Sequence, residues 1–170
     1  MHPYTPFYYE LLKSNRESVK KVLELGVGCK KTMRHVPQYQ MGASLYMWRD
    51  FFPNAKIFGA DIFPETIIKT DRIETFLCDQ SLKKDLEGLI KKTGSDIDIF
   101  IDDGSHVKEH QIFTARTLMP LLKKDVIYII EDVEYPDIVS GALNEYDCQI
   151  PEIPRKYIDD RIIIVRNKQL

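Results

Sequence analysis

The chain lacks any long apolar run. Its longest apolar stretches lie in "DVIYII" and "RIIIVR" and are far shorter than the roughly 20 residues that cross a bilayer as a helix. The N-terminus "MHPYTPFYYELLKSNRES" also lacks the basic start and apolar stretch of an export signal. We therefore expect no membrane partner and no export.

The chain is also poor in cysteine and carries no excess of positive charge. The three cysteines, Cys29, Cys78 and Cys148, are odd in number and form no CxxC pair, which favours reduced thiols and a cytoplasmic location. Lysine and arginine total 24 against 26 acidic residues, a net charge of -2, so no positive field is available to hold a phosphate backbone. We expect no nucleic acid partner.

The order of apolar segments predicts a single α/β domain over residues 1–170. A hydrophobic fraction of 44% is enough to fill one core. We expect seven strands, at residues 20–28, 55–62, 73–79, 96–103, 125–132, 145–150 and 160–166. Amphipathic segments at helical spacing fall at residues 8–20, 44–52, 82–92 and 110–122. This alternation predicts a mostly parallel sheet with helices on both faces, and the last two strands form a hairpin at one edge.

Polar residues follow the first three expected strands, where open α/β sheets bind ligands. Gly26 and Gly28 in "ELGVG" allow a backbone to approach a ligand closely, although a turn into a helix often needs glycine merely to turn. Asp61 in "GADI" can accept two hydrogen bonds from a ribose diol. Asp79 and Gln80 in "CDQS" can reach a third point, such as an adenine amino group. The set is typical of an adenosine cofactor.

A dinucleotide cofactor fits this pattern poorly. The third glycine of the dinucleotide motif is missing, and Asp61 lies 35 residues beyond Gly26 instead of the usual ~20. An adenosine cofactor without a pyrophosphate remains, and S-adenosylmethionine is the leading candidate.

Acidic pairs end the fourth and fifth expected strands. Asp102 and Asp103 point to opposite sides of a strand, so we expect only one of them to enter a site. Asp103 would then lie near Glu131 and Asp132, and such carboxylates repel one another unless a cation compensates. Oxygen ligands select a hard ion such as Mg²⁺ or Ca²⁺. The alternative is that these acids only cap the helices that follow.

The segment "HVKEH" spells the H-x-x-E-H pattern of an inverted zinc protease helix. That motif needs His106 and His110 on one helix, whereas Gly104 and Ser105 favour a turn and a helix start just before them. The zinc interpretation is therefore disfavoured. His106 beside a hard cation is the better general base, because an ordinary imidazole pKa near ~6.5 suits proton removal at neutral pH. The role of His110 is left open.

Five motifs occur in the following order between residues 21 and 133: "LELGVG", "GASLYMWRDFFPNAKIFGADI", "CDQS", "IDDGSH" and "YIIEDV". Together they resemble the metal-dependent sugar O-methyltransferases of macrolide pathways, the mycinamicin and tylosin deoxysugar enzymes. The resemblance implies the Rossmann-like class I methyltransferase fold, a seven-stranded sheet with an antiparallel last strand.

The resemblance also implies roles for individual residues. One set would bind S-adenosylmethionine through its methionine, ribose and adenine parts: Glu24, Gly26, Gly28, Ser44, Asp61, Asp79 and Gln80. A second set would bind Mg²⁺: Asp103, Glu131 and Asp132. His106 would be the general base that removes the proton of a sugar hydroxyl.

The sequence also leads to expectations about the acceptor, the alternative functions and the role of the N-terminal segment. The additional N-terminal domain of the macrolide enzymes has no counterpart in these 170 residues, so we expect a smaller acceptor: a small sugar, a sugar nucleotide or a glycan end. The alternatives are an O-methyltransferase of catechols or other small phenols, and a cofactor-binding subunit without catalysis. The aromatic segment "PYTPFYYELL" indicates either a homodimer contact or a lid over the site.

Overall fold

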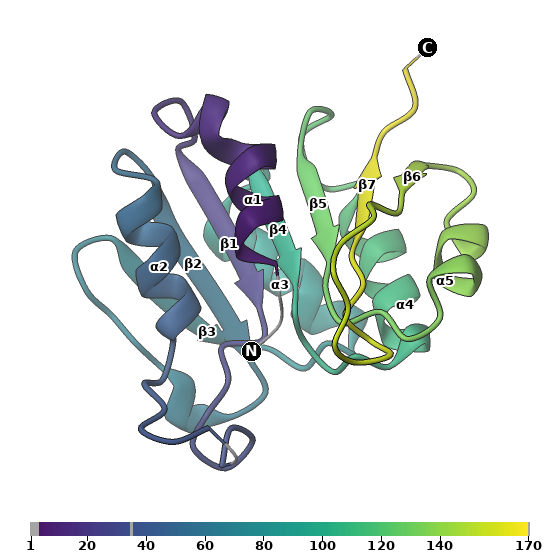
Figure 1. The fold of residues 1–170 in the computed structure, drawn as a ribbon. Helices are drawn as coiled ribbons and strands as arrows, with labels where there is room; N and C mark the ends of the chain where they lie inside the picture. The colour runs from purple at the N-terminus through teal and green to yellow at the C-terminus, as the bar shows by residue number, and fades with distance from the viewer. Residues whose placement is uncertain (1–3, 35, 170) are drawn as a thin grey trace.

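The computed structural model describes residues 4–34 and 36–169, and it shows a seven-stranded sheet with helices on both faces (Figure 1). The strands are β1 Lys21–Leu25, β2 Lys56–Asp61, β3 Ile73–Leu77, β4 Ile99–Asp102, β5 Ile127–Ile130, β6 Asp147–Gln149 and β7 Ile163–Arg166. The helices are α1 Thr5–Leu12, α2 Ala43–Phe51, α3 Lys83–Thr93, α4 Lys108–Leu118 and α5 Pro136–Ala142, with 3-10 turns η1 Lys13–Asn15 and η2 Pro64–Thr66.

The strand order is β3-β2-β1-β4-β5-β7-β6. Strands β1 to β5 pair in parallel, and β7 runs antiparallel to both β5 and β6. The expected mostly parallel sheet and the edge hairpin are confirmed. The chain moves outward from β1 in one direction and from β4 in the other, so the strand order reverses between β1 and β4. Ligands of open α/β sheets bind at the carboxyl ends of strands at such a point.

The register brings three strand ends to one level. Leu25 of β1 pairs with Asp102 of β4, which pairs in turn with Ile130 of β5. The residues that follow these strands, Gly26, Asp103 and Glu131, therefore leave the sheet side by side.

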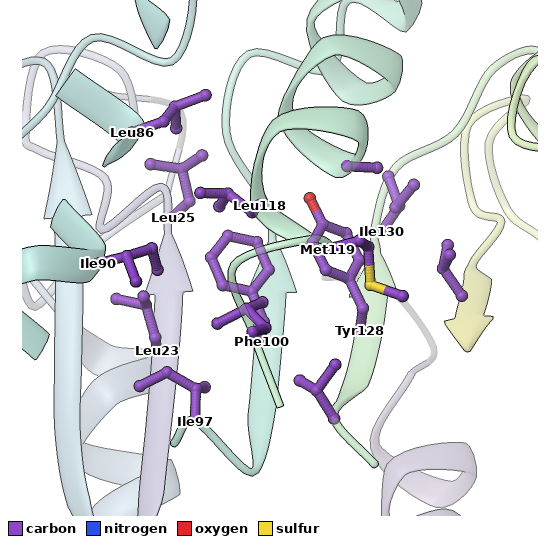
Figure 2. Close-up of a cluster of buried hydrophobic side chains, with 14 of the residues drawn as sticks. Leu23, Leu25, Leu86, Ile90, Ile97, Phe100, Leu118, Met119, Tyr128 and Ile130 are labelled. Carbon is purple, nitrogen blue, oxygen red and sulfur yellow. The ribbon is translucent and has the colours of Figure 1, made fainter. Parts of the chain in front are cut away.

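Both faces of the sheet are buried, as the unbroken apolar strand sequences predict. Helices α1 and α2 pack on one face with Val22, Ile57 and Ile99, whereas α3, α4 and α5 pack on the other. Figure 2 shows part of this second face, where the rings of Phe100 and Tyr128 stack with centroids 4.6 Å apart. Each fully buried aromatic or aliphatic side chain contributes about 1.5–3 kcal/mol relative to an exposed one.

Two expectations about helices were wrong. The first helix begins at Thr5 and ends at Leu12, not over residues 8–20, because Pro6 favours a helix start and the chain tightens into η1 before Asn15. Helix α5 was not expected at all. It has only seven residues, and Pro136 and Val139 are the two that it buries, so its sequence carries little helical periodicity. The other three helices lie close to the expected segments.

The aromatic N-terminal segment packs against other parts of the same chain. Tyr4, Tyr8 and Leu12 are buried against the sheet and α2, and Tyr9 remains exposed; Pro3 lies outside the described residues. Its start reaches the residues just after β5, where Tyr4 and Tyr8 contact Asp132 and Glu131. The lid and the homodimer both stay predictions. Helices long and apolar enough to span a membrane are absent from the described part of the chain.

Candidate active site

The site is built where β1 and β4 end. Gly26 has φ +101°, and a Cβ atom added to it would lie 1.8 Å from the carbonyl oxygen of Asp103. Only glycine permits this close approach of two backbones. The Gly26 N–H donates to Ala60 O at 2.8 Å and the Asp103 N–H donates to Leu25 O at 2.8 Å. The turn after β1 is thereby fixed against the residue that opens the loop after β4.

The carboxylate of Asp61 fixes the next residues of the turn after β1, Val27 and Gly28. Its Oδ2 accepts hydrogen bonds from the N–H groups of Val27 and Gly28 at 2.9 and 3.0 Å, and its Oδ1 accepts one from Phe63 N–H at 3.0 Å. The carboxylate is buried at the carboxyl end of β2. A ribose diol bound by Asp61 would share the carboxylate with these backbone donors, and its role in cofactor binding stays a prediction.

Glu24 and Ser44 form a polar corner beside the turn. The Ser44 hydroxyl donates to Glu24 Oε1, and the indole Nε1 of Trp48 donates to Glu24 Oε2 at 2.6 Å. Burial and, after it, the negative charge of Asp103 raise the pKa of Glu24 to about 8, although both hydrogen bonds act against this. The structure thus places together two of the residues expected to bind the cofactor.

The side chain of Gln80 forms hydrogen bonds to β4 and to the loop that follows it. Its amide Nε2 donates to Asp102 Oδ1 at 2.6 Å, and its Oε1 accepts the backbone N–H of Ser105 at 2.9 Å. Asp79 Oδ1 accepts the N–H and hydroxyl of Ser81 at 2.9 and 2.7 Å. Gln80 thus links the end of β3 to the loop after β4. The expected contact of both residues with adenine stays a prediction.

The two adjacent aspartates at the end of β4 face opposite sides, as expected. Asp102 is 1% exposed, and burial is the main cause that raises its pKa to about 7. Asp103 is partly exposed and lines the pocket described below. Only Asp103 enters the site.

Asp103, His106 and Asp132 are close enough together to bind one metal ion. Each offers one ligand atom, and the three atoms lie within 4.8 Å of one another. His106 Nε2 is 3.2 Å from Asp103 Oδ1, and His106 Nδ1 is 3.6 Å from Asp132 Oδ2. His106 and Asp132 have φ values of +58° and +50°, a left-handed conformation that costs energy in residues other than glycine. Two carboxylates and an imidazole suit a divalent cation.

The negative charges of Asp103 and Asp132 change the pKa of the His106 imidazole. Burial by itself would lower the pKa of His106, but the hydrogen bond and charge of Asp103, with the charge of Asp132, raise it to about 9. The imidazole is therefore protonated at neutral pH in the metal-free protein.

Glu131 lies beside the cluster but is not part of it. Its Oε1 accepts a hydrogen bond from the Tyr8 hydroxyl at 2.5 Å, and Asp132 Oδ1 accepts one from the Tyr4 hydroxyl at 2.6 Å. Burial, then the charge of Asp103, raises the pKa of Glu131 well above its ordinary value. Burial and these carboxylates also raise the pKa of both tyrosines, so the hydroxyls remain donors.

The chain is similar to known proteins in sequence and in fold. No family model matches the chain. It is 39% identical over 132 residues to a tetracenomycin rhamnosyl 3'-O-methyltransferase of Streptomyces olivaceus, which covers 78% of this chain and 32% of that protein. It is 35% identical over 150 residues to mycinamicin VI 2''-O-methyltransferase of Micromonospora griseorubida, covering 87% of this chain and 36% of the relative. The chain thus spans about a third of the length of these curated relatives.

A solved structure agrees with these relatives. MycE methyltransferase from the mycinamycin pathway, in complex with Mg, SAH and mycinamycin VI, superposes with a TM-score of 0.75 at 26% identity, over 96% of this chain and 49% of MycE. The chain has the class I methyltransferase fold. The cmcI-D160 structure with Mg and SAM, at 20% identity and a TM-score of 0.65, has the same fold.

Within this methyltransferase fold, a pocket of about 270 Å³ opens between α1, α2 and the strand ends. Its polar side carries Glu24, Ser44, Asp103 and Glu131, so it joins expected cofactor residues to expected metal residues. Its other lining residues are mainly aromatic or apolar: Tyr4, Thr5, Tyr8, Tyr9, Met47, Trp48 and Phe51.

The zinc protease arrangement is absent from the described residues. His106 precedes α4, and His110, inside that helix, shares a hydrogen bond of 2.9 Å with the Ser105 hydroxyl through Nδ1. Glu109 is exposed and forms an ion pair with Lys108. The two histidines therefore do not share a helix face.

Sequence reasoning missed Tyr4 and Tyr8 as site residues. Their only signal is a four-residue spacing, which places both on one face of a helix, within the segment "PYTPFYYELL". Their partners lie 128 and 123 residues further along the chain.

Proposed function

We propose that this methyltransferase domain transfers the methyl group of S-adenosylmethionine to a sugar hydroxyl, with Mg²⁺ as a second cofactor. The observation that carries the proposal is the cluster of Asp103, His106 and Asp132, next to the glycine turn at the end of β1. The named relatives are sugar O-methyltransferases, and the MycE complex contains Mg and SAH.

The residues of the site support this chemistry. A sugar hydroxyl ionises too weakly to attack a methyl group at neutral pH, and a cation held by Asp103 and Asp132 would supply Lewis acidity toward its oxygen. His106 accepts the hydroxyl proton on a ring nitrogen, and Asp103, 3.2 Å from the imidazole, fixes the orientation of the ring. The oxygen then bonds to the methyl carbon as the carbon–sulfur bond breaks.

The remaining work is alignment of oxygen, methyl carbon and sulfur. Glu24 and Ser44 would orient the methionine end of the cofactor, and Gly26 lets the backbone approach it. Asp61 would bind the ribose, with Asp79 and Gln80 on the adenine side. Glu131, beside this cluster, would complete the metal ligands. These assignments are part of the proposal.

We propose a small sugar, a sugar nucleotide or a glycan end as the acceptor. A pocket of about 270 Å³ beside Asp103 has room for a single sugar ring. The three free cysteines, two of them buried, agree with a reducing compartment, and we place the protein in the cytoplasm. We also propose a homodimer; a light-scattering mass of 19.9 kDa for the isolated chain would argue against it.

One observation favours a second candidate function, methylation of a catechol or another small phenol. The pocket is lined by Tyr8, Trp48 and Phe51, which suit an aromatic ring. A panel of rhamnosides, sugar nucleotides and catechols, assayed with labelled S-adenosylmethionine, separates the two. We expect transfer to the sugars, and transfer confined to the catechols would select the second function.

The non-catalytic alternative predicts a different result. A cofactor-binding subunit would bind S-adenosylmethionine but transfer no methyl group to any acceptor. Calorimetry with S-adenosylhomocysteine, with and without Mg²⁺, and a turnover assay on the same preparation therefore distinguish it from both enzyme functions.

A further inference from the structure

Helix α1 brings two phenol groups onto the acidic end of β5. The Tyr8 hydroxyl donates to Glu131 Oε1 at 2.5 Å, and the Tyr4 hydroxyl donates to Asp132 Oδ1 at 2.6 Å. Tyr4 caps the start of α1 and Tyr8 lies one turn into it, on the same side, so one side of this helix start contacts two adjacent carboxylates. Both tyrosines are almost fully buried, at 5% and 6% exposure, and a hydrogen bond is stronger in such surroundings.

The hydrogen bonds divide the oxygens of Asp132 between two tasks. Oδ1 accepts from Tyr4, while Oδ2 faces the imidazole of His106 at 3.6 Å, in the cluster with Asp103. A donor on one oxygen fixes the plane of the carboxylate, and the other oxygen is then held toward the cluster.

The backbone and side chain of Glu131 are each fixed by a separate donor. Gln111 Nε2 donates to its carbonyl oxygen at 3.0 Å, and Tyr8 holds its side chain. The Tyr8 ring itself packs edge-on against Trp48, with centroids 5.0 Å apart at 77°. The donor to Glu131 is therefore part of a packed aromatic contact between α1 and α2.

We propose that Tyr4 and Tyr8 are positioning residues, whose hydroxyl groups hold Asp132 and Glu131 in the orientation that a divalent cation needs. The inference rests on the proposed function, because it assumes that these carboxylates bind a cation. Outer donors of this kind typically change metal affinity 10–100-fold when they are removed. The opposing idea is that the phenols occupy the carboxylates in place of the cation, so that α1 must move before the cation binds.

The test measures cation binding without any turnover. Mn²⁺ or Mg²⁺ is titrated calorimetrically into the unmodified protein and into Tyr4→Phe, Tyr8→Phe and the double variant. Each substitution removes a hydroxyl and keeps the ring, and circular dichroism with thermal unfolding in chelator establishes that each variant is folded. Tyr46→Phe on α2, whose ring stacks on Arg49, is the matched control.

We expect each single variant to bind the cation about 10-fold more weakly and the double variant up to about 100-fold more weakly, with the Tyr46→Phe affinity unchanged. Unchanged affinity in folded variants would overturn the inference and leave the proposed function intact, as would tighter binding, which the displacement idea requires. Failure of the unmodified protein to bind either cation would instead contradict the metal requirement of the proposed function itself. Because the two hydroxyls contact different carboxylates, either variant tests the inference if the other does not fold.

Discussion

The single residue on which the proposed chemistry depends most is His106, which lies between the side chains of Asp103 and Asp132. Replacing it with alanine removes the proposed general base, so we expect turnover to fall by about 10²–10⁴-fold. Binding of S-adenosylhomocysteine, measured by calorimetry, should not change.

His110→Ala is the matched control for this prediction. His110 lies four residues further on and contacts Ser105, so we expect only a small change in turnover. Full activity of His106→Ala would show that another group is the base.

Gly26 offers a test of the backbone contact between β1 and β4. Its replacement by alanine would place a Cβ atom 1.8 Å from Asp103 O, at a φ of +101°. We expect Gly26→Ala to lower the free energy of unfolding by at least about 2 kcal/mol, measured by urea denaturation. Gly88→Ala, where no atom lies within 4 Å in the middle of α3, should instead stabilise the protein by about 1 kcal/mol. Equal effects of the two substitutions would contradict the close approach.

At the scale of elements, the side chain of Asp98 connects the starts of three strands, β1, β4 and β5. Its Oδ2 accepts the N–H groups of Lys20 and Lys21 at 2.6 and 2.9 Å, just before and at the start of β1, and its Oδ1 pairs with Lys123, near β5. Burial would raise the pKa of Asp98, but these hydrogen bonds outweigh it and lower the pKa below its ordinary value. The ionised carboxylate therefore stabilises the fold.

We expect Asp98→Asn to lower the free energy of unfolding by about 1–3 kcal/mol at pH 7. Because the pKa is lower in the folded protein, this stabilisation is present above the unfolded pKa near ~3.9 and is lost as the pH falls through the folded pKa. The difference between the two proteins should therefore shrink in acid. Asp96→Asn, which removes one exposed ion pair with Lys21, should cost under about 1 kcal/mol. A difference for Asp98→Asn that stayed constant down to pH 2 would contradict this account.

The elements could largely be predicted from the sequence, and the exceptions have physical causes. Strands buried on both faces, such as β4 and β5, read as apolar runs and were found for that reason. Strand β6 is mostly exposed at the sheet edge, and it was found as one arm of the expected hairpin. The helices with long apolar stripes, such as α3 with Leu86, Leu89 and Ile90 buried, were also found. Helix α5 was missed because a helix of two turns is held by tertiary packing and not by its own periodicity.

The candidate site was predictable where local sequence sets geometry. Asp102 and Asp103 alternate across β4, so one of them had to face the pocket and the other the interior. Tyr4 and Tyr8 were missed because their partners are set by the fold of the whole chain, over more than 120 residues. The links from Gln80 to Asp102 and Ser105 are likewise invisible in the order of residues.

At the scale of the whole molecule, the structure gathers carboxyl groups at the carboxyl ends of the strands, although the chain carries a net charge of only -2. Glu24, Asp103, Glu131 and Asp132 lie together there. A divalent cation bound to the folded state alone stabilises it, by about 2.7 kcal/mol at a concentration 100 times its Kd.

We therefore expect Mg²⁺ to raise the midpoint of thermal unfolding of the unmodified protein. Asp103→Asn should remove this increase, whereas Asp96→Asn, at the opposite ends of the strands, should retain it. An equal increase in all three proteins would show that the cation acts elsewhere.

The central claim is metal-dependent methylation of a sugar hydroxyl, and the rate of methyl transfer to a sugar acceptor as Mg²⁺ is removed and restored tests it most directly. With labelled S-adenosylmethionine and a rhamnoside acceptor, the account predicts transfer to the sugar that stops when a chelator is added and returns as Mg²⁺ is titrated back. Transfer at an undiminished rate in chelator, or an absence of transfer to every sugar in a protein that binds both cofactors, would contradict it.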